Sequence, residues 1–491
     1  MASNRHSEII AAGELHERAS VHFALGHRLA LVAGHDDGHS LRAVYLFTDG
    51  APDARHELIV VLDRENPTVS TLSDLSFSAS RFEREMRDNF GIEPIDHPFL
   101  RPLVRHQHWP EQWYPLRQEA GPMPAHVSEA PHYPFIEVGG SGVYEIPVGP
   151  VHAGMIEPGH FRFSVVGETI LKMTARLWYV HRGVERMFQG IGPDEGVAIA
   201  QRISGDSALA HSLAYCMAVE EAQGLEVSDD ARQLRALLLE MERLYNHVGD
   251  LGALCNDVSF AVANARALVV RERLLRLNEG LTGHRLLRGA VGVGYTRVQV
   301  LPTQKDLTEI GEAFEDVVSL ALSNTVVVDR FEGTAYLSAA DAAAIGTVGV
   351  VGRASGLDFD ARRAHPFAAD GVQSVVQDGG DVMARFTQRV QEFRISLDVV
   401  RALVEGARSL EGGSSSTGES IGSGVGIVEG WRGVVVHRVE LDSSGRISRA
   451  RTVDPSFFNW PALAIALNDT IVPDFPLANK SFNLSYAGND L

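Results

Sequence analysis

The chain has 491 residues, 45% of them hydrophobic, and 63 acidic residues against 44 basic ones give a formal net charge of −19. This composition predicts a globular protein long enough for more than one domain. The acidic balance, without a basic run interleaved with aromatic residues, disfavours a nucleic-acid partner. We find neither a stretch of the ~20 apolar residues that span a bilayer nor a signal-peptide core. Any membrane association is therefore expected to go through partner subunits.

Residues 1–118 are expected to form a small α+β domain. Strand-like runs at 41–47 and 56–62 flank a turn at 50–52. The segment 119–145 is rich in proline, glycine and small polar residues, and we interpret it as an interdomain linker.

Residues 146–491 are predicted to be mainly helical with a small β portion, so the whole chain is expected to be α+β. A strand is expected near 161–166. Ser228 is a predicted helix N-cap, and apolar residues then recur at helical spacing as far as Leu251. A second long helix is predicted over 381–409, followed by a glycine- and serine-rich loop at 412–418. Two long amphipathic helices indicate a helical bundle.

Three segments near the start of this second unit carry a family resemblance. They read Gly-Pro-Val-His at 149–152, Glu-Pro-Gly-His-Phe-Arg-Phe at 157–163 and Tyr-Val-His-Arg-Gly-Val-Glu at 179–185. These resemble the large subunit of formate-hydrogenlyase-type nickel–iron hydrogenases, relatives of the C and D subunits of respiratory complex I. Similar matches extend the resemblance over nearly the whole chain, at 82–92, 97–102, 353–367, 429–433 and 451–461. The resemblance implies a C-subunit-like domain fused to a D-subunit-like one.

The cysteines that bind metal in the resembled hydrogenases are absent from this chain. In those hydrogenases two Cys-x-x-Cys pairs hold nickel and iron, and the matching positions here are Ser204, Ser207, Ser485 and Gly488. A serine hydroxyl is a poor replacement for a soft thiolate, and glycine offers no side-chain ligand. We therefore expect no metal at these positions, no cofactor bound by this chain and no nickel–iron hydrogenase activity of its own.

The segment before the next helix loses a second family side chain. The tyrosine that complex I uses against quinone falls at Gly205, although a quinone site stays an alternative. Ser204, Asp206 and Ser207 either cap that helix or, with Glu157 or His160, bind a hard cation.

Proton transfer has its own candidates. The resemblance makes Glu157, His160 and His152 candidates for proton transfer or for a quinone site. In the hydrogenases a Glu-Gly-His element near the metal helps to move protons, and in complex I a histidine-bearing loop in this region contributes to the quinone site. A glutamate in a partly buried cleft can have its pKa raised into the operating range, so Glu157 leads. The alternative is that these side chains only hold a domain interface.

Several charged residues have supporting roles in this interpretation. Arg202 and Asp206 flank the replaced cysteine positions, and Arg432 stands in the segment 429–433 that resembles a Glu-Ala-Pro-Arg-Gly element of the family. Arg353 belongs either to a charged site or to a structural ion pair. Glu240, Arg243 and His247 share one helix face, which we interpret as solvated, with a proton or conformational path as the alternative, whereas Cys216 and Cys255 are predicted to be buried. The glycines at 422–426 lack the strand–turn–helix unit of a dinucleotide site.

The resemblance implies a large-subunit-like component of a membrane-associated oxidoreductase assembly, of formate hydrogenlyase or NADH dehydrogenase type. The component would lack nickel–iron ligands and couple electron transfer or conformational change to proton or ion movement. Its expected partners are a small iron–sulfur subunit, which would hold an iron–sulfur cluster, and integral membrane subunits, on the cytoplasmic face of the cell membrane. In complex I, NADH binds a different subunit. The alternatives are a purely structural scaffold and a quinone-reactive NADH:quinone oxidoreductase-like subunit.

Overall fold

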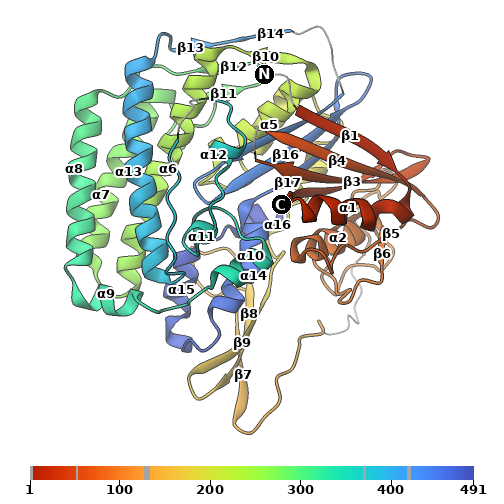
Figure 1. Cartoon of the computed structure of the whole chain (residues 1–491), viewed down its shortest axis with the longest axis horizontal. Helices are drawn as coiled ribbons and strands as arrows, with labels where there is room; N and C mark the ends of the chain where they lie inside the picture. The colour runs from red at the N-terminus through yellow and green to blue at the C-terminus, as the bar shows by residue number, and fades with distance from the viewer. Residues whose placement is uncertain (1–3, 51–52, 126–132, 369–371, 417–421) are drawn as a thin grey trace.

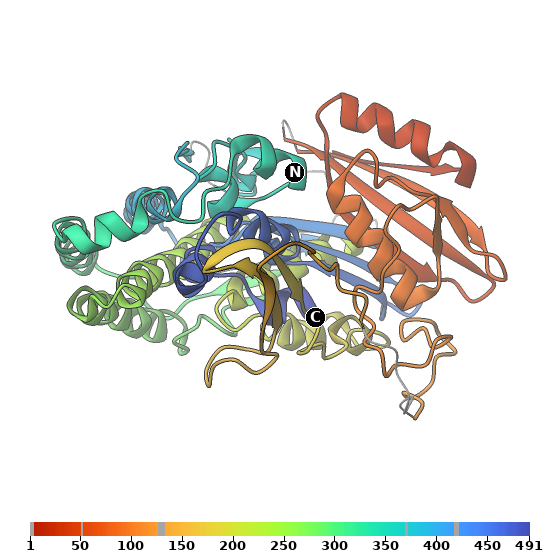
Figure 2. The ribbon, with the colours of Figure 1, turned by 90° about the horizontal axis from the view of Figure 1, so that it is seen from below.

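The computed structural model describes residues 4–50, 53–125, 133–368, 372–416 and 422–491. An N-terminal sheet with two helices lies on one side of the molecule and a bundle of long helices lies on the other (Figure 1). A second sheet and the C-terminal helices lie between them, and the same order is visible from below in Figure 2. The predicted α+β class is confirmed.

The N-terminal sheet has the strand order β1-β4-β3-β2, with β1 parallel to β4 and the other pairs antiparallel. The predicted strands lie in β3 and β4, and α2 packs against β2. A short parallel pair, β5 and β6, flanks α2. The elements of this unit are β1 (Asn4–Ile10), η1 (Ala12–Glu14), α1 (Leu15–Ala24), β2 (Arg28–Asp36), β3 (Ser40–Asp49), β4 (Ala54–Asp63), β5 (Thr68–Ser70), α2 (Phe77–Phe90) and β6 (Glu93–Ile95).

A three-stranded antiparallel meander projects from the rest of the molecule at the bottom of Figure 1. It consists of β7 (Val143–Val148), β8 (His160–Val166) and β9 (Thr169–Arg176). Alternate residues of β8, namely Phe161, Phe163 and Val165, are buried, as expected for a strand with one face on the core. The exposed loop between β7 and β8 carries Glu157.

The helical bundle consists of α6 (Asp229–Asp257), α7 (Ala261–Thr282), α8 (Gln304–Leu322) and α13 (Val382–Gly406). The Ser228 side chain accepts the Ala231 N–H at 3.3 Å, which confirms the predicted cap. Asp381 caps α13 in the same way, through the Ala384 N–H at 2.7 Å. Both predicted long helices are therefore confirmed.

The central sheet brings the C-terminal half against α5 (Ala208–Gln223). It consists of β15 (Ser423–Glu429), β16 (Val434–Leu441) and β17 (Ile447–Val453), and α5 packs on the first two strands. A Cβ built on Gly424 or Gly426 would overlap the carbonyl oxygen of Ala218 or Ala214 of α5. These glycines therefore allow a close helix–sheet contact.

The shorter elements complete the chain. The expected loop at 412–418 is partly wrong, because residue 412 belongs to β13 and residues 414–416 form β14, whose backbone groups pair with β12 and β10. Residues 417 and 418 lie outside the described residues. The shorter elements are α3 (Val184–Met187), α4 (Pro193–Ala200), β10 (Leu225–Val227), β11 (Val291–Gly292), β12 (Tyr295–Arg297), α9 (Thr325–Phe331), α10 (Ala339–Ile345), α11 (Gly349–Arg353), α12 (Ala361–Ala364), β13 (Glu411–Gly412), β14 (Ser414–Ser416), α14 (Pro455–Ala466), η2 (Val472–Asp474), α15 (Phe475–Phe482) and α16 (Tyr486–Asp490).

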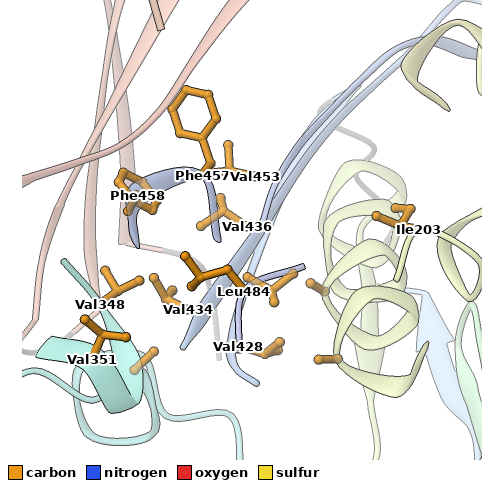
Figure 3. Close-up of a cluster of buried hydrophobic side chains, with 14 of the residues drawn as sticks. Ile203, Val348, Val351, Val428, Val434, Val436, Val453, Phe457, Phe458 and Leu484 are labelled. Atoms are coloured by element: carbon orange, nitrogen blue, oxygen red, sulfur yellow. The ribbon is translucent and has the colours of Figure 1, made fainter. Parts of the chain in front are cut away.

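A buried apolar cluster supports the region where these elements meet (Figure 3). Ile203 and Leu484, which directly precede Ser204 and Ser485, are part of it. Burial of these neighbours fixes the backbone on which the two serines stand. The other labelled members come from the central sheet, α14 and the start of α11: Val348, Val351, Val428, Val434, Val436, Val453, Phe457 and Phe458.

Buried ion pairs join the N-terminal unit to the central sheet. Arg438 of β16 donates to Glu57 of β4 at 2.8 Å, and Arg451 of β17 donates to Glu85 of α2 at 2.6 Å. The domain boundaries at 118 and 145 stay a prediction. Among the described residues, no helix is both long and apolar enough to cross a membrane.

Candidate functional site

The four positions that match the family's cysteines come together in the structure. The hydroxyl oxygens of Ser204 and Ser485, 281 residues apart in the chain, are 2.9 Å from each other and buried. The Gly488 N–H donates to the Ser485 hydroxyl at 2.9 Å, so Ser485 caps α16. Ser207 accepts the indole N–H of Trp431 at 3.1 Å in the same region.

Asp206 and Arg432 form a two-armed ion pair beside these serines. Both N–O distances are 2.6 Å, and the remaining arm of Arg432 donates to the Asn483 carbonyl at 2.5 Å. Burial acts to raise the pKa of Asp206, but the guanidinium outweighs it and lowers that pKa below its ordinary value. Asp206 also accepts the Ser204 hydroxyl proton at 2.9 Å. Two of the four predicted supporting residues therefore belong to the site.

Asp454 occupies the space beside Gly488, and the sequence interpretation missed it. A Cβ built on Gly488 would lie 2.5 Å from both Cγ and Oδ2 of this carboxylate. Asp454 accepts the Ser456 N–H at 2.8 Å and lies 3.0 Å from Nε2 of His211, so it is held in place. Burial acts to raise the pKa of Asp454, but the bond to His211 helps to lower it below its ordinary value.

A line of buried polar side chains continues from Asp454 into the central sheet. His211 Nδ1 lies 3.1 Å from His437 Nε2, and His437 Nδ1 lies 3.3 Å from the Thr452 hydroxyl. Burial holds the pKa of His437 well below its ordinary value, and His211 adds to the effect, so the imidazole of His437 is neutral.

The prediction that Ser204, Asp206 or Ser207 caps the following helix is wrong. Ser207 stands at the N-cap of α5 without a side-chain bond to the helix. Glu242 of α6 does this task instead, because its two carboxylate oxygens accept the N–H groups of Leu209 and Ala210 at 2.7 and 3.0 Å. Burial raises the pKa of Glu242 to about 8.

The three candidates for proton transfer are placed differently. The Glu157 carboxylate accepts the Ala487 N–H at 2.9 Å, between positions 485 and 488. Glu157 is exposed, so the expectation of a partly buried cleft is wrong; the loop that carries it runs over the surface. His152 Nε2 lies 3.4 Å from the Tyr486 hydroxyl, whereas His160 contacts the Gly149 carbonyl at 3.3 Å.

Asp490 is a titratable group of the site that sequence reasoning missed. Its side chain is buried and accepts the Val180 N–H at 3.1 Å. Burial raises the pKa of Asp490 to about 6, and nearby Glu157 adds to the rise. Asp490 lines a small cavity together with His181 and Glu185. The sequence signal that could have identified Asp490 is its position two residues after Gly488.

Arg202 and Arg353 lie outside this cluster. Arg202 is exposed and donates to the Ala198 carbonyl at 2.6 Å. Arg353 is buried and donates to Glu392 at 2.8 Å and to Glu429 at 2.7 Å, which favours the structural ion pair of the two alternatives.

The expectation of a solvated face at Glu240, Arg243 and His247 is wrong. All three residues are buried, because α13 covers this face of α6 with matching polar groups. Arg243 donates to Glu240 at 3.0 Å, and His247 Nε2 lies 3.0 Å from Glu392 of α13. Glu240 also accepts from Arg362 at 3.2 Å. The pairing of these charges offsets part of the desolvation cost of burying them.

The residues present do not fit a nickel–iron centre. The hydroxyls of Ser204 and Ser485 bond each other, and Asp454 fills the space of a fourth ligand. The hard-cation alternative also loses its carboxylate, because Arg432 holds both oxygens of Asp206. Over the described ranges, no three or more His, Cys, Asp or Glu side chains are grouped to hold a metal ion.

Both cysteines are buried and free, as predicted. Burial raises the pKa of Cys255 to about 12, and that of Cys216 also rises, so both thiols are protonated at neutral pH. Buried protonated thiols are poor metal ligands and poor nucleophiles.

Family models match three parts of the chain. The respiratory-chain NADH dehydrogenase 30 Kd subunit model matches residues 8–125, the nickel-dependent hydrogenase model matches 182–254 and the respiratory-chain NADH dehydrogenase 49 Kd subunit model matches 257–421. The order agrees with a C-like part followed by a D-like part.

Curated relatives extend over most of the chain. Formate hydrogenlyase subunit 5 of Escherichia coli K12 is 32% identical over 448 residues, which cover 88% of this chain and 78% of the relative. Hydrogenase-4 component G of the same organism is 32% identical over 485 residues, covering 94% and 83%. The C/D subunit of NADH-quinone oxidoreductase from Phocaeicola vulgatus is 28% identical over 408 residues, covering 77% and 78%.

A solved structure shares the fold. A chain of the membrane-bound sulfane sulfur reductase, an archaeal respiratory membrane complex, superposes with a TM-score of 0.64 at 23% identity, covering 71% of this chain and 99% of that one. The two relatives above 30% identity, together with the family models, show that the chain belongs to the oxidoreductase family of formate-hydrogenlyase-type hydrogenase large subunits and fused NADH-quinone oxidoreductase C/D subunits.

Proposed function

We propose that the chain is the large-subunit-like component of a membrane-associated, complex-I-like oxidoreductase assembly. In this proposal it holds no nickel–iron centre and couples electron transfer or conformational change to proton or ion movement. The observation that carries the proposal is the Glu157 carboxylate bonded to the Ala487 N–H at 2.9 Å. An exposed carboxylate thereby touches the segment in which the family's second cysteine pair would stand.

The proposed partners are a small iron–sulfur subunit and integral membrane subunits, and a quinone-reactive assembly is the alternative. The names of the relatives support this, because they are subunits or components of multisubunit enzymes, and the similar structure is that of a respiratory membrane complex. We place the chain on the cytoplasmic face of the membrane, attached through these partners.

The first experiment measures metal content. The tagged chain is purified gently from detergent-solubilised membranes, and nickel and iron are measured per mole of chain. Iron without nickel, together with small and membrane subunits, is the expected result. Stoichiometric nickel would contradict the absence of a nickel–iron centre, and a chain recovered alone would contradict the assembly.

The second experiment tests Glu157. In the purified assembly, Glu157→Gln should lower the coupled turnover by about 10-fold or more, because general acid–base groups contribute at least this much. Glu168→Gln is the matched control, since it removes an exposed carboxylate from the turn between β8 and β9 of the same meander. Equal turnover in the two variants would contradict a coupling role for Glu157.

A structural scaffold is the second candidate function. It is favoured by the site itself, in which Ser204, Asp206 and Arg432 are all bonded to other side chains. Under this alternative, Glu157→Gln leaves turnover unchanged, whereas changes on the surfaces that bind the partners abolish assembly.

A further inference from the structure

The polar groups at the replaced cysteine positions form one directed chain of hydrogen bonds. Both oxygens of Asp206 pair with the Arg432 guanidinium, so this carboxylate accepts only and the Ser204 hydroxyl must donate to it. The Ser485 hydroxyl must then donate to Ser204, and it accepts the Gly488 N–H. Both hydroxyl protons are therefore committed, and each bond polarises the next.

This chain of bonds joins two elements that are remote in sequence. One end is the segment 202–207 before α5, anchored by Arg432 on Asp206. The other end is α16, whose first turn is capped by Ser485. The relatives' metal would link the same two segments through four cysteines, as the family resemblance implies.

At Gly488, the fourth of the replaced cysteine positions, the space for a side chain is also filled. Gly488 has Asp454 against it, and this carboxylate is held by the Ser456 N–H and by His211. Any side chain at 488 needs Asp454 to move, which breaks the cap of α14 and takes the carboxylate partner away from Nε2 of the buried His211.

We propose that this chain has rebuilt the place of the metal centre as a metal-free clasp between the segment 202–207 and α16. The clasp consists of Ser204, Ser485, Asp206 and Arg432, with Asp454 in the space of the fourth ligand. It is closed to nickel even when all four cysteines are restored. The inference stands whether or not the chain works in a membrane assembly.

The first test compares two glycines of the site. Gly488→Ala should lower the melting temperature, because the new methyl group meets Asp454. Gly205→Ala is the matched control, since a Cβ there has no other atom within 4 Å. Thermal unfolding of both variants is followed by circular dichroism. Equal melting temperatures would overturn the assignment of Asp454 to this space.

The second test is a double-mutant cycle on the clasp. Ser204→Ala and Ser485→Ala should each lower the melting temperature, and the double variant should lose less than the sum, because both changes remove the same bond. Additive losses would mean that the two hydroxyls are not coupled, and the clasp would be wrong.

The third test restores the cysteines. The variant with Ser204→Cys, Ser207→Cys, Ser485→Cys and Gly488→Cys is dialysed against nickel(II) chloride, and bound nickel is measured with the thiolate-to-nickel absorption. The variant should bind far less than one nickel per chain, and adding Asp454→Ala should increase the uptake. Stoichiometric nickel in the four-cysteine variant alone would overturn closure of the site, as would uptake that Asp454→Ala leaves unchanged.

Discussion

Asp490 is a buried carboxyl whose protonation depends on the fold. Burial raises its pKa from 3.8 to about 6, so the folded protein binds more protons than the unfolded one between these values. The contribution of Asp490 to stability is therefore lost as pH rises from about 4 to about 6, by up to about 3 kcal/mol, and is constant above that range.

Asp490→Asn should remove this pH dependence. Urea unfolding at a series of pH values measures it, with the wild-type protein losing stability relative to the variant over that window. Parallel profiles for the two proteins would contradict the raised pKa.

At this scale the sequence predicts some residues of the site and misses others. Ser204 and Ser485 are found because the segments around them resemble the family. Asp454 and Glu242 are missed because their contacts with α5 join residues 243 and 33 positions apart, which no local pattern reports. Glu157 is predicted as a site residue, but its predicted partial burial is wrong, because residue type does not show whether a loop is buried or exposed.

At the scale of elements, α13 covers α6 through buried charges as well as apolar contacts. Glu392 accepts from Arg353 at 2.8 Å and lies 3.0 Å from His247 Nε2. Burial acts to raise the pKa of Glu392, but Arg353 and its neighbours hold that pKa well below its ordinary value. Glu392→Gln removes a negative charge that pairs with the buried Arg353 guanidinium. This loss should lower the free energy of unfolding by about 3–5 kcal/mol.

Glu315→Gln is the matched change for this prediction. Glu315 of α8 pairs with Arg394 of α13 at 2.7 Å, but both side chains are at least 40% exposed. Its loss should cost no more than about 1 kcal/mol. Chemical denaturation measures both variants, and equal losses would contradict the difference between buried and exposed pairs.

The same helices show why element type is easier to predict than what covers a face. Periodicity predicts α6 and α13 to within a few residues, and the predicted cap at Ser228 marks the start of α6. The polar face with Glu240 is wrongly interpreted as solvated. A helical pattern shows which residues share a face, but it does not show that another helix, here α13, covers that face.

At the scale of the whole molecule, the N-terminal unit is tied into the larger one. Arg451 binds both Glu85 of the first unit and Glu185 of the second, and Arg438 binds Glu57, with all these side chains largely buried. The proline- and glycine-rich segment 119–145 suggests separable units, yet these pairs lose their partners if the units part.

We therefore expect one cooperative unfolding transition for the whole chain. Differential scanning calorimetry measures it, with the calorimetric enthalpy equal to the van't Hoff enthalpy. Two resolved transitions would contradict the coupling of the units.

The bond between Ser204 and Ser485 also bears on how the protein is made. Synthesis proceeds from the N-terminus, so the segment before α5 leaves the ribosome 281 residues ahead of its partner serine. Until Ser485 is translated, the segment around Asp206 lacks its contacts with α16. Contacts between residues this far apart in sequence also form slowly. A stretch translated long after the segment 202–207 therefore completes the middle of the molecule, and nascent chains released before Ser485 lack this contact.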